Sequence, residues 1–78
     1  MVWTEQEWTE WTKRLLKAEL TRRGITYGEL AKRLHAIGID DSERNISNKI
    51  SRGGFSATYF FQIMEAIGVE TLHLDTRE

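Results

Sequence analysis

Glycine, and not proline, sets the points at which this chain can change direction. The sequence contains no proline, and five of its six glycines follow segments in which apolar residues recur with helical spacing. Glycine readily adopts the left-handed conformation that ends a helix, because it carries no Cβ. The segments that precede these glycines are KAELTRR, AKRLHAI, NISNKISR and FQIMEAI. We therefore expect a series of short helices joined by tight connections.

Polar residues that can cap helices mark where the same segments start. Thr26 is followed three residues later by Glu29, which is the spacing of a capping box, and Thr4 with Glu7 repeats that spacing. Ser56 is a candidate cap for the last helix. The helix before it has three candidate caps, Asp40, Asp41 and Ser42. Four helices are predicted, near residues 4–23, 26–37, 42–52 and 56–67.

Apolar periodicity predicts the faces that these helices bury. Leu30 and Leu34 repeat at a spacing of four in the second segment, and Ile63 and Ile67 do so in the fourth. Leu16 is expected to join them from the first helix, together with Leu20. After Gly68 the period changes, and VETLHLD suggests a short extended segment. The predicted fold class is an all-α bundle of four to five helices with a short C-terminal extended segment.

Length and composition limit the domain organisation. Seventy-eight residues suffice for a single domain, expected to span residues 1–78, with one small core. There is no cysteine and no long apolar run, and the N-terminus is acidic and polar where a secretory signal would be basic and then apolar. We therefore expect a cytoplasmic protein with no membrane association.

The net charge of −1 hides a basic block between two acidic ends. Residues 1–10 carry three acids and no base, and residues 11–53 carry ten bases against five acids. Residues 54–78 carry one base against four acids. A basic block of this kind suits a polyanionic partner, although solvated helices also carry many basic residues.

The third segment, SERNISNKISRG, has two clearly different faces. At about 100° per residue, Ile46 and Ile50 fall in one narrow sector, and the opposite sector holds Arg44, Asn48, Ser51 and Arg52. No acidic residue occurs from residue 44 to residue 64. Arginine, asparagine and serine suit base edges and phosphates, but a merely solvated polar face is an equally open interpretation.

The order of the second and third segments is known from DNA-binding domains. TYGELAKRLHAIG, a capped segment, is followed by a short polar connection and then by SERNISNKISRG. From about residue 15 to 69 the chain resembles the helix-turn-helix domains of phage repressors, also called Cro-like or XRE-like. The positions that match that family are Gly24, Ile25, Thr26, Leu30, Ala31, Leu34, Gly53 and Val69. The chain also resembles a small bacterial helix-turn-helix-like family whose function is not established.

The resemblance implies a repressor-like core, residues 15–69, between a Trp-rich extension, residues 1–14, and a tail, residues 70–78. It also implies that the third helix enters the major groove of double-stranded DNA. The implied base contacts are Arg44, Asn45, Ser47 and Asn48. The implied phosphate contacts are Thr26, Tyr27, Lys32, Arg33, Lys49, Ser51 and Arg52.

This chain also departs from that family's pattern. HAIGIDDSER makes the connection before the third helix longer than usual, so we expect it to lengthen the second helix by about a turn and to loosen the sharp turn after it. Tyr27 and Gly28 stand where the family often has glutamine and glutamate. A monomer with few contacts would bind weakly, so specific binding implies a homodimer on two half-sites roughly 34 Å apart or a multiple of that distance.

The segment WTEQEWTEWTKRLL gives the first helix a second apolar face. Trp8 and Trp11 lie on a face different from that of Leu16 and Leu20. They either cover the chain's own residues 69–74 or form a subunit interface, where tryptophan is a typical anchor. The second interpretation adds Leu72 and Leu74 to the interface. Trp3 is expected to be exposed or frayed.

Catalysis has no support in the sequence. The two histidines lack neighbouring metal ligands, no cysteine can act as a nucleophile, and the glycines mark helix ends where a phosphate-cradling loop would need them together. We expect no enzymatic activity, cofactor, metal or small-molecule ligand. Two function classes remain. One is a small bacterial or phage transcriptional regulator that binds DNA, and the other is a protein-interaction module that keeps the fold without binding DNA.

Overall fold

The chain forms four helices in the part that the structure describes. The computed structural model describes residues 2–72 and residue 74. Its helices are α1 (Glu5–Arg22), α2 (Tyr27–Ala36), α3 (Glu43–Arg52) and α4 (Ala57–Ile67). Each predicted helix is confirmed with its ends within one residue, and the all-α fold class is confirmed. None of the helices among these residues has the length and apolar character needed to cross a membrane.

Each helix starts at a hydroxyl side chain that accepts a backbone hydrogen bond. The four capping residues are Thr4, Thr26, Ser42 and Ser56. At α1 the predicted capping box is complete, because the Glu7 carboxylate also accepts a hydrogen bond from the backbone N–H of Thr4 at 2.8 Å. Of the three candidate caps for α3, Ser42 takes the position. Asp41, another of the three candidates, instead accepts hydrogen bonds from side chains of α3 and α4.

Left-handed glycines end the last two helices. Gly53 ends α3 with a φ of 70°, and Gly68 ends α4 with a φ of 81°. At Gly68 the chain turns so that the N–H of Val69 donates to the carbonyl of Met64 at 3.0 Å. The glycine signals in the sequence therefore did mark helix ends.

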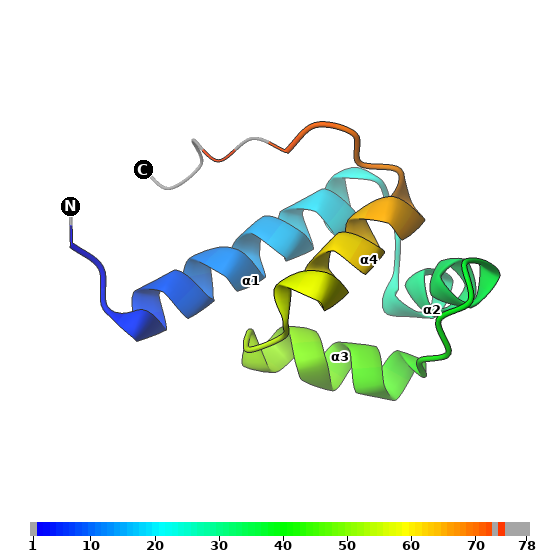
Figure 1. The fold of residues 1–78 in the computed structure, drawn as a ribbon, viewed down its shortest axis with the longest axis horizontal. Helices are drawn as coiled ribbons and strands as arrows, with labels where there is room; N and C mark the ends of the chain where they lie inside the picture. The colour runs from blue at the N-terminus through cyan, green and yellow to red at the C-terminus, as the bar shows by residue number, and fades with distance from the viewer. Residues whose placement is uncertain (1, 73, 75–78) are drawn as a thin grey trace.

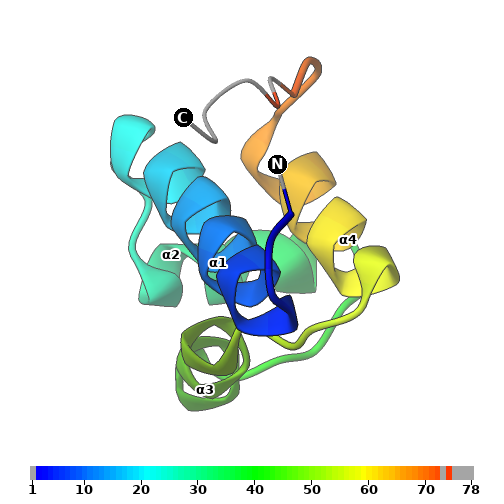
Figure 2. The same cartoon turned by 90° about the vertical axis from the view of Figure 1, so that its left-hand side faces the viewer.

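One apolar core joins all four helices. Helix α2 packs on α3 and α4, and α1 contacts α3. Figures 1 and 2 show α3 along one edge of the molecule, and both α1 and α4 lie on the same side of it. The fully buried side chains are Leu16, Leu30, Leu34, Ile46, Ile50 and Ile63. The predicted buried faces are confirmed, and the outer side of α3 is left facing away from the other helices.

The C-terminal segment, for which an extended conformation is predicted, forms no strand in the part that the structure describes. Val69 and Leu72 pack against the core, but no strand occurs among residues 2–72 and 74. Its alternation of apolar and polar residues is imperfect, and a single strand without a partner is not stable. The remaining residues of the predicted segment, His73 and 75–78, lie outside the described residues.

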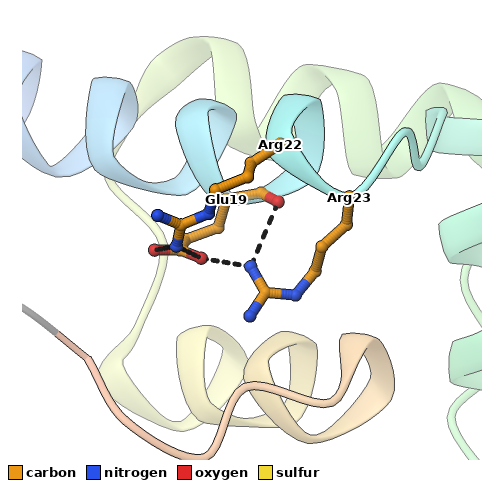
Figure 3. A network of polar contacts seen from close by, with 3 residues as sticks. All are labelled: Glu19, Arg22 and Arg23. Carbon is orange, nitrogen blue, oxygen red and sulfur yellow. Dashed lines mark hydrogen bonds and ion pairs between the residues drawn. The ribbon is translucent and has the colours of Figure 1, made fainter.

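A buried carboxylate ties together the C-terminal end of α1. Glu19 has a side chain only 8% exposed, and Arg22 donates two hydrogen bonds to it at 2.5 and 2.6 Å. Arg23 donates a further one (Figure 3). Burial raises the pKa of Glu19, but the hydrogen bonds from the two arginines outweigh it and hold the pKa below the ordinary glutamate value. Two of the ten cations of the basic block are thus paired with a single carboxylate, which offsets one of their two charges.

We expect the protein to lose stability in acid through Glu19 and Asp41, because the pKa of each carboxyl is lowered in the folded state. Their stabilisation is present above the unfolded pKa values, about 4, and is lost as the pH falls through the folded values. Urea titrations from pH 7 to pH 2.5 measure this loss. Asp41→Asn is expected to flatten the acid limb and to lower the free energy of unfolding at pH 7 by about 1–3 kcal/mol. If Glu65→Gln, at an exposed position on α4, has the same effect, this assignment is wrong.

Candidate nucleic-acid interface

Helix α3 exposes the polar sector that the sequence predicted. Ile46 and Ile50 have no solvent exposure, which fixes the rotation of the helix about its axis. The exposed side chains opposite them are Arg44, Asn48, Ser51 and Arg52. Ser47 is half-buried on the flank. The outer edge of α3 therefore presents arginine, asparagine and serine side chains with no carboxylate among them.

Asp41 fixes the connection between α2 and α3. Its side chain is only 5% exposed, and one carboxylate oxygen, Oδ2, accepts hydrogen bonds from Lys49 Nζ at 2.9 Å and from the Tyr59 hydroxyl at 2.8 Å. Burial raises the pKa of Asp41, but these hydrogen bonds, with a further one from Asn45, outweigh it and lower the pKa. Burial, together with the same contact, raises the pKa of Tyr59. The long connection, which the sequence suggested would be loose, is thus attached to both α3 and α4.

Two of the predicted DNA contacts on α3 are bonded to Asp41 instead of pointing outward. Lys49 pairs with Asp41, and its ammonium also lies 4.5 Å from the centre of the Tyr59 ring. Asn45 lies one turn before Lys49 on the same flank and hydrogen bonds to the same carboxylate. The folded chain directs these two side chains toward the α2–α3 connection, and leaves Arg44 and Asn48 on the outer edge.

The other end of α3 is held by α1. A Cβ added to Gly53 would lie 2.7 Å from Thr9 Cγ2 and 3.2 Å from the Thr9 carbonyl oxygen. One turn along α1, the Lys13 ammonium donates to the carbonyl of Ser51 at 3.1 Å. Helix α3 is therefore supported at its start by Asp41 and at its end by the first half of α1.

The start of α2 contains the remaining candidate phosphate contacts. Thr26 caps the helix, and a pocket between α1 and α2 is lined by Lys17, Leu20, Thr21, Ile25, Thr26 and Tyr27. Lys17 was not among the predicted contacts, because on the α1 wheel it is simply a polar residue. The side chain of Lys32 on α2 is exposed. Next to it, Arg33 Nε donates a hydrogen bond to Glu29 Oε2 at 3.2 Å. Free N–H groups at a helix start favour anions, and at the N-terminal end of α2 the Glu43 carboxylate already lies close by, with its Oε1 3.1 Å from the position that a Cβ on Gly28 would take.

The three tryptophans form a cluster of their own at the start of α1. The ring centre of Trp3 lies 4.6 Å from that of Trp8 and 6.1 Å from that of Trp11. The expectation that Trp3 is exposed or frayed was wrong, because its ring packs on the other two. Trp8 remains 41% exposed. Of the other predicted interface residues, Leu72 packs against the core and Leu74 is 51% exposed.

A comparison with protein families finds one match, which covers residues 8–72. The matching family is described as "Domain of unknown function (DUF6471)". The chain belongs to this family. The DUF6471 match includes all of α2, α3 and α4, and it starts at Trp8, so Trp8 and Trp11 of α1 both fall inside it. No curated protein and no solved structure matches the chain.

Proposed function

We propose that this DUF6471 domain is a sequence-specific DNA-binding protein, a small transcriptional regulator of the repressor helix-turn-helix type. Helix α3 enters the major groove, and Arg44, Ser47 and Asn48 reach base edges. The observation that carries the proposal is the outer edge of α3. It is polar, exposed and free of carboxylates, and it belongs to a helix supported at both ends.

Phosphate contacts surround that edge in the proposed complex. Thr26 and Tyr27 lie at the first turn of α2, and Lys17 lines the same pocket. Lys32 and Arg52 carry exposed cations for which the described part of the chain provides no ion pair. These contacts set the position on the duplex and make the affinity depend on salt.

The DNA-binding proposal is tested by a mobility-shift titration on genomic fragments at two salt concentrations. We expect binding that weakens steeply with salt and that prefers some fragments over others. Absence of any shift at low salt contradicts the proposal, and so does a shift without sequence preference.

The second candidate function is a protein-interaction module without DNA binding. It is favoured by the ion pairs that three carboxylates of the chain make with Arg22, Arg23, Arg33 and Lys49 of the basic block. Phe61, which is 63% exposed on α4, would suit a protein partner. Binding that is independent of DNA sequence, together with a stable protein complex, would support this candidate.

Binding to two half-sites requires a dimer, and we propose that the Trp cluster forms its interface. Trp8→Ala with Trp11→Ala is expected to convert a dimer, twice 9.1 kDa, into a monomer in sedimentation velocity. The control variant is Phe61→Ala, which removes an exposed aromatic ring from α4 and should leave the mass unchanged. An unchanged mass for the tryptophan variant would show that the cluster packs only within its own chain and forms no subunit interface.

A further inference from the structure

The C-terminal end of α3 is completed by a lysine from another helix. Lys13 of α1 donates from Nζ to the carbonyl oxygen of Ser51 at 3.1 Å, although the two residues are 38 positions apart in the sequence. Ser51 is the last residue but one of α3, so its carbonyl is one of the four that no N–H of the helix itself can reach. A cation also suits the negative end of the helix macrodipole. The contact therefore satisfies α3 where the helix cannot satisfy itself.

The Lys13 ammonium is held within the protein. It pairs with Glu10 Oε2 at 3.1 Å, and the side chain of Lys13 is only 20% exposed. The Cβ of Lys13 lies 3.7 Å from the position that a Cβ on Gly53 would take, so its stem also lies against the end of α3. Lys13 belongs to the basic block by its place in the sequence. These contacts nevertheless direct its charge to α3 instead of to a phosphate.

The same part of α1 carries the proposed dimer interface on its other face. At about 100° per residue, Thr9 and Lys13 lie on the face toward α3, and Trp8 and Trp11 lie nearly opposite them. The four residues occupy less than two turns, about 8 Å of helix. Figure 2, which looks along α1 from its start, shows α3 below this part of the helix. A short helical segment thus joins the Trp cluster to the end of α3.

We propose that Lys13 is a positioning residue for DNA recognition, which ties α3 to the dimer interface without touching DNA. The inference rests on the proposed function, including its dimer. In a dimer formed through the Trp clusters, the two α3 helices are connected through the two α1 segments, and the Lys13 contact fixes each connection at its α3 end. The distance between the α3 helices then sets the half-site spacing that the dimer accepts.

Fluorescence anisotropy with two duplexes measures this role. One duplex carries the half-sites at the preferred spacing, and the other has one additional base pair between them. Lys13→Met keeps a long unbranched side chain and removes both the donor and the charge. We expect it to reduce the ratio of the two affinities by about fivefold, the share of one hydrogen bond, while the affinity falls with salt at the wild-type slope. A general loss of stability would lower both affinities together and leave the ratio unchanged.

The matched control is Lys17→Met, the same substitution one turn further along α1. Lys17 is exposed and contacts a phosphate in the proposed complex. Its loss is therefore expected to reduce the salt slope by about one per half-site and to leave the spacing ratio unchanged. Circular dichroism checks that both variants are folded.

The outcomes separate this inference from the proposed function. An unchanged spacing ratio for Lys13→Met, or a wild-type ratio of one, overturns the positioning role and leaves DNA recognition standing. A reduced salt slope for Lys13→Met also overturns it, because the lysine would then contact a phosphate. A wild-type chain without any sequence preference overturns the proposed function and this inference together.

Discussion

Gly53→Ala is expected to lower the free energy of unfolding by about 2–4 kcal/mol. The left-handed backbone at φ 70° disfavours any residue with a Cβ, and the added methyl group would meet Thr9 Cγ2 at 2.7 Å and the Thr9 carbonyl oxygen at 3.2 Å. A chain of this length has a total stability of roughly 4–12 kcal/mol, so the loss is a large share of it. Urea denaturation followed by circular dichroism measures the change.

Gly24→Ala is the matched control for that experiment. Gly24 has nearly the same φ, 66°, but no atom lies within 4 Å of the Cβ that alanine would add. Gly24→Ala is therefore expected to lower the free energy of unfolding by the backbone strain alone, about 1–2 kcal/mol. Thr9→Ser removes the Cγ2 methyl group that the new Cβ would meet. Added to Gly53→Ala, it is expected to restore part of the lost free energy of unfolding. Equal losses for the two glycine variants would show that the contact between α3 and α1 is not close enough to matter.

Arg44→Ala combined with Asn48→Ala is expected to abolish specific DNA binding without unfolding the protein. Each bidentate base contact discriminates by about 1–3 kcal/mol, so the loss of two contacts weakens specific binding by about thirtyfold or more. Both side chains are exposed, and the helix keeps its buried isoleucines, so the far-UV circular dichroism spectrum is expected to stay unchanged.

The control pair is Arg14→Ala with Gln6→Ala, which likewise removes an arginine and a carboxamide side chain, but from exposed positions of α1. It is expected to lower the affinity only modestly, through the loss of one charge. If it weakens specific binding as much as the α3 pair does, α3 is not the helix that contacts bases. The binding constants are measured by fluorescence anisotropy on the preferred duplex.

The helices were predictable because their signals are local. A hydroxyl residue at the start and a glycine at the end lie within a few residues of the turn that they control, as Ser56 and Gly68 do for α4. The buried faces were predictable for the same reason, since Ile46 and Ile50 are one helical turn apart. Local patterns therefore suffice for the helix boundaries and the exposed face of α3.

The contacts that support α3 could not be predicted, because they join residues far apart in the sequence. Asp41 binds Tyr59, eighteen residues away, and among three adjacent candidate caps nothing local distinguished it. Gly53 signalled a helix end, but its packing against Thr9 depends on how α1 crosses α3. Trp3 lies before the first helix, where no periodicity applies, so its contact with Trp8 was not visible in the sequence.

The central claim is that α3 recognises a DNA sequence as part of a dimer, and selection from a random duplex library tests it most directly. The protein is incubated with the library, the bound duplexes are separated and amplified over several rounds, and the final pool is sequenced. We predict a common motif made of two related half-sites whose centres lie about 10 base pairs, or a multiple of that, apart. A final pool as random as the starting library would contradict the account.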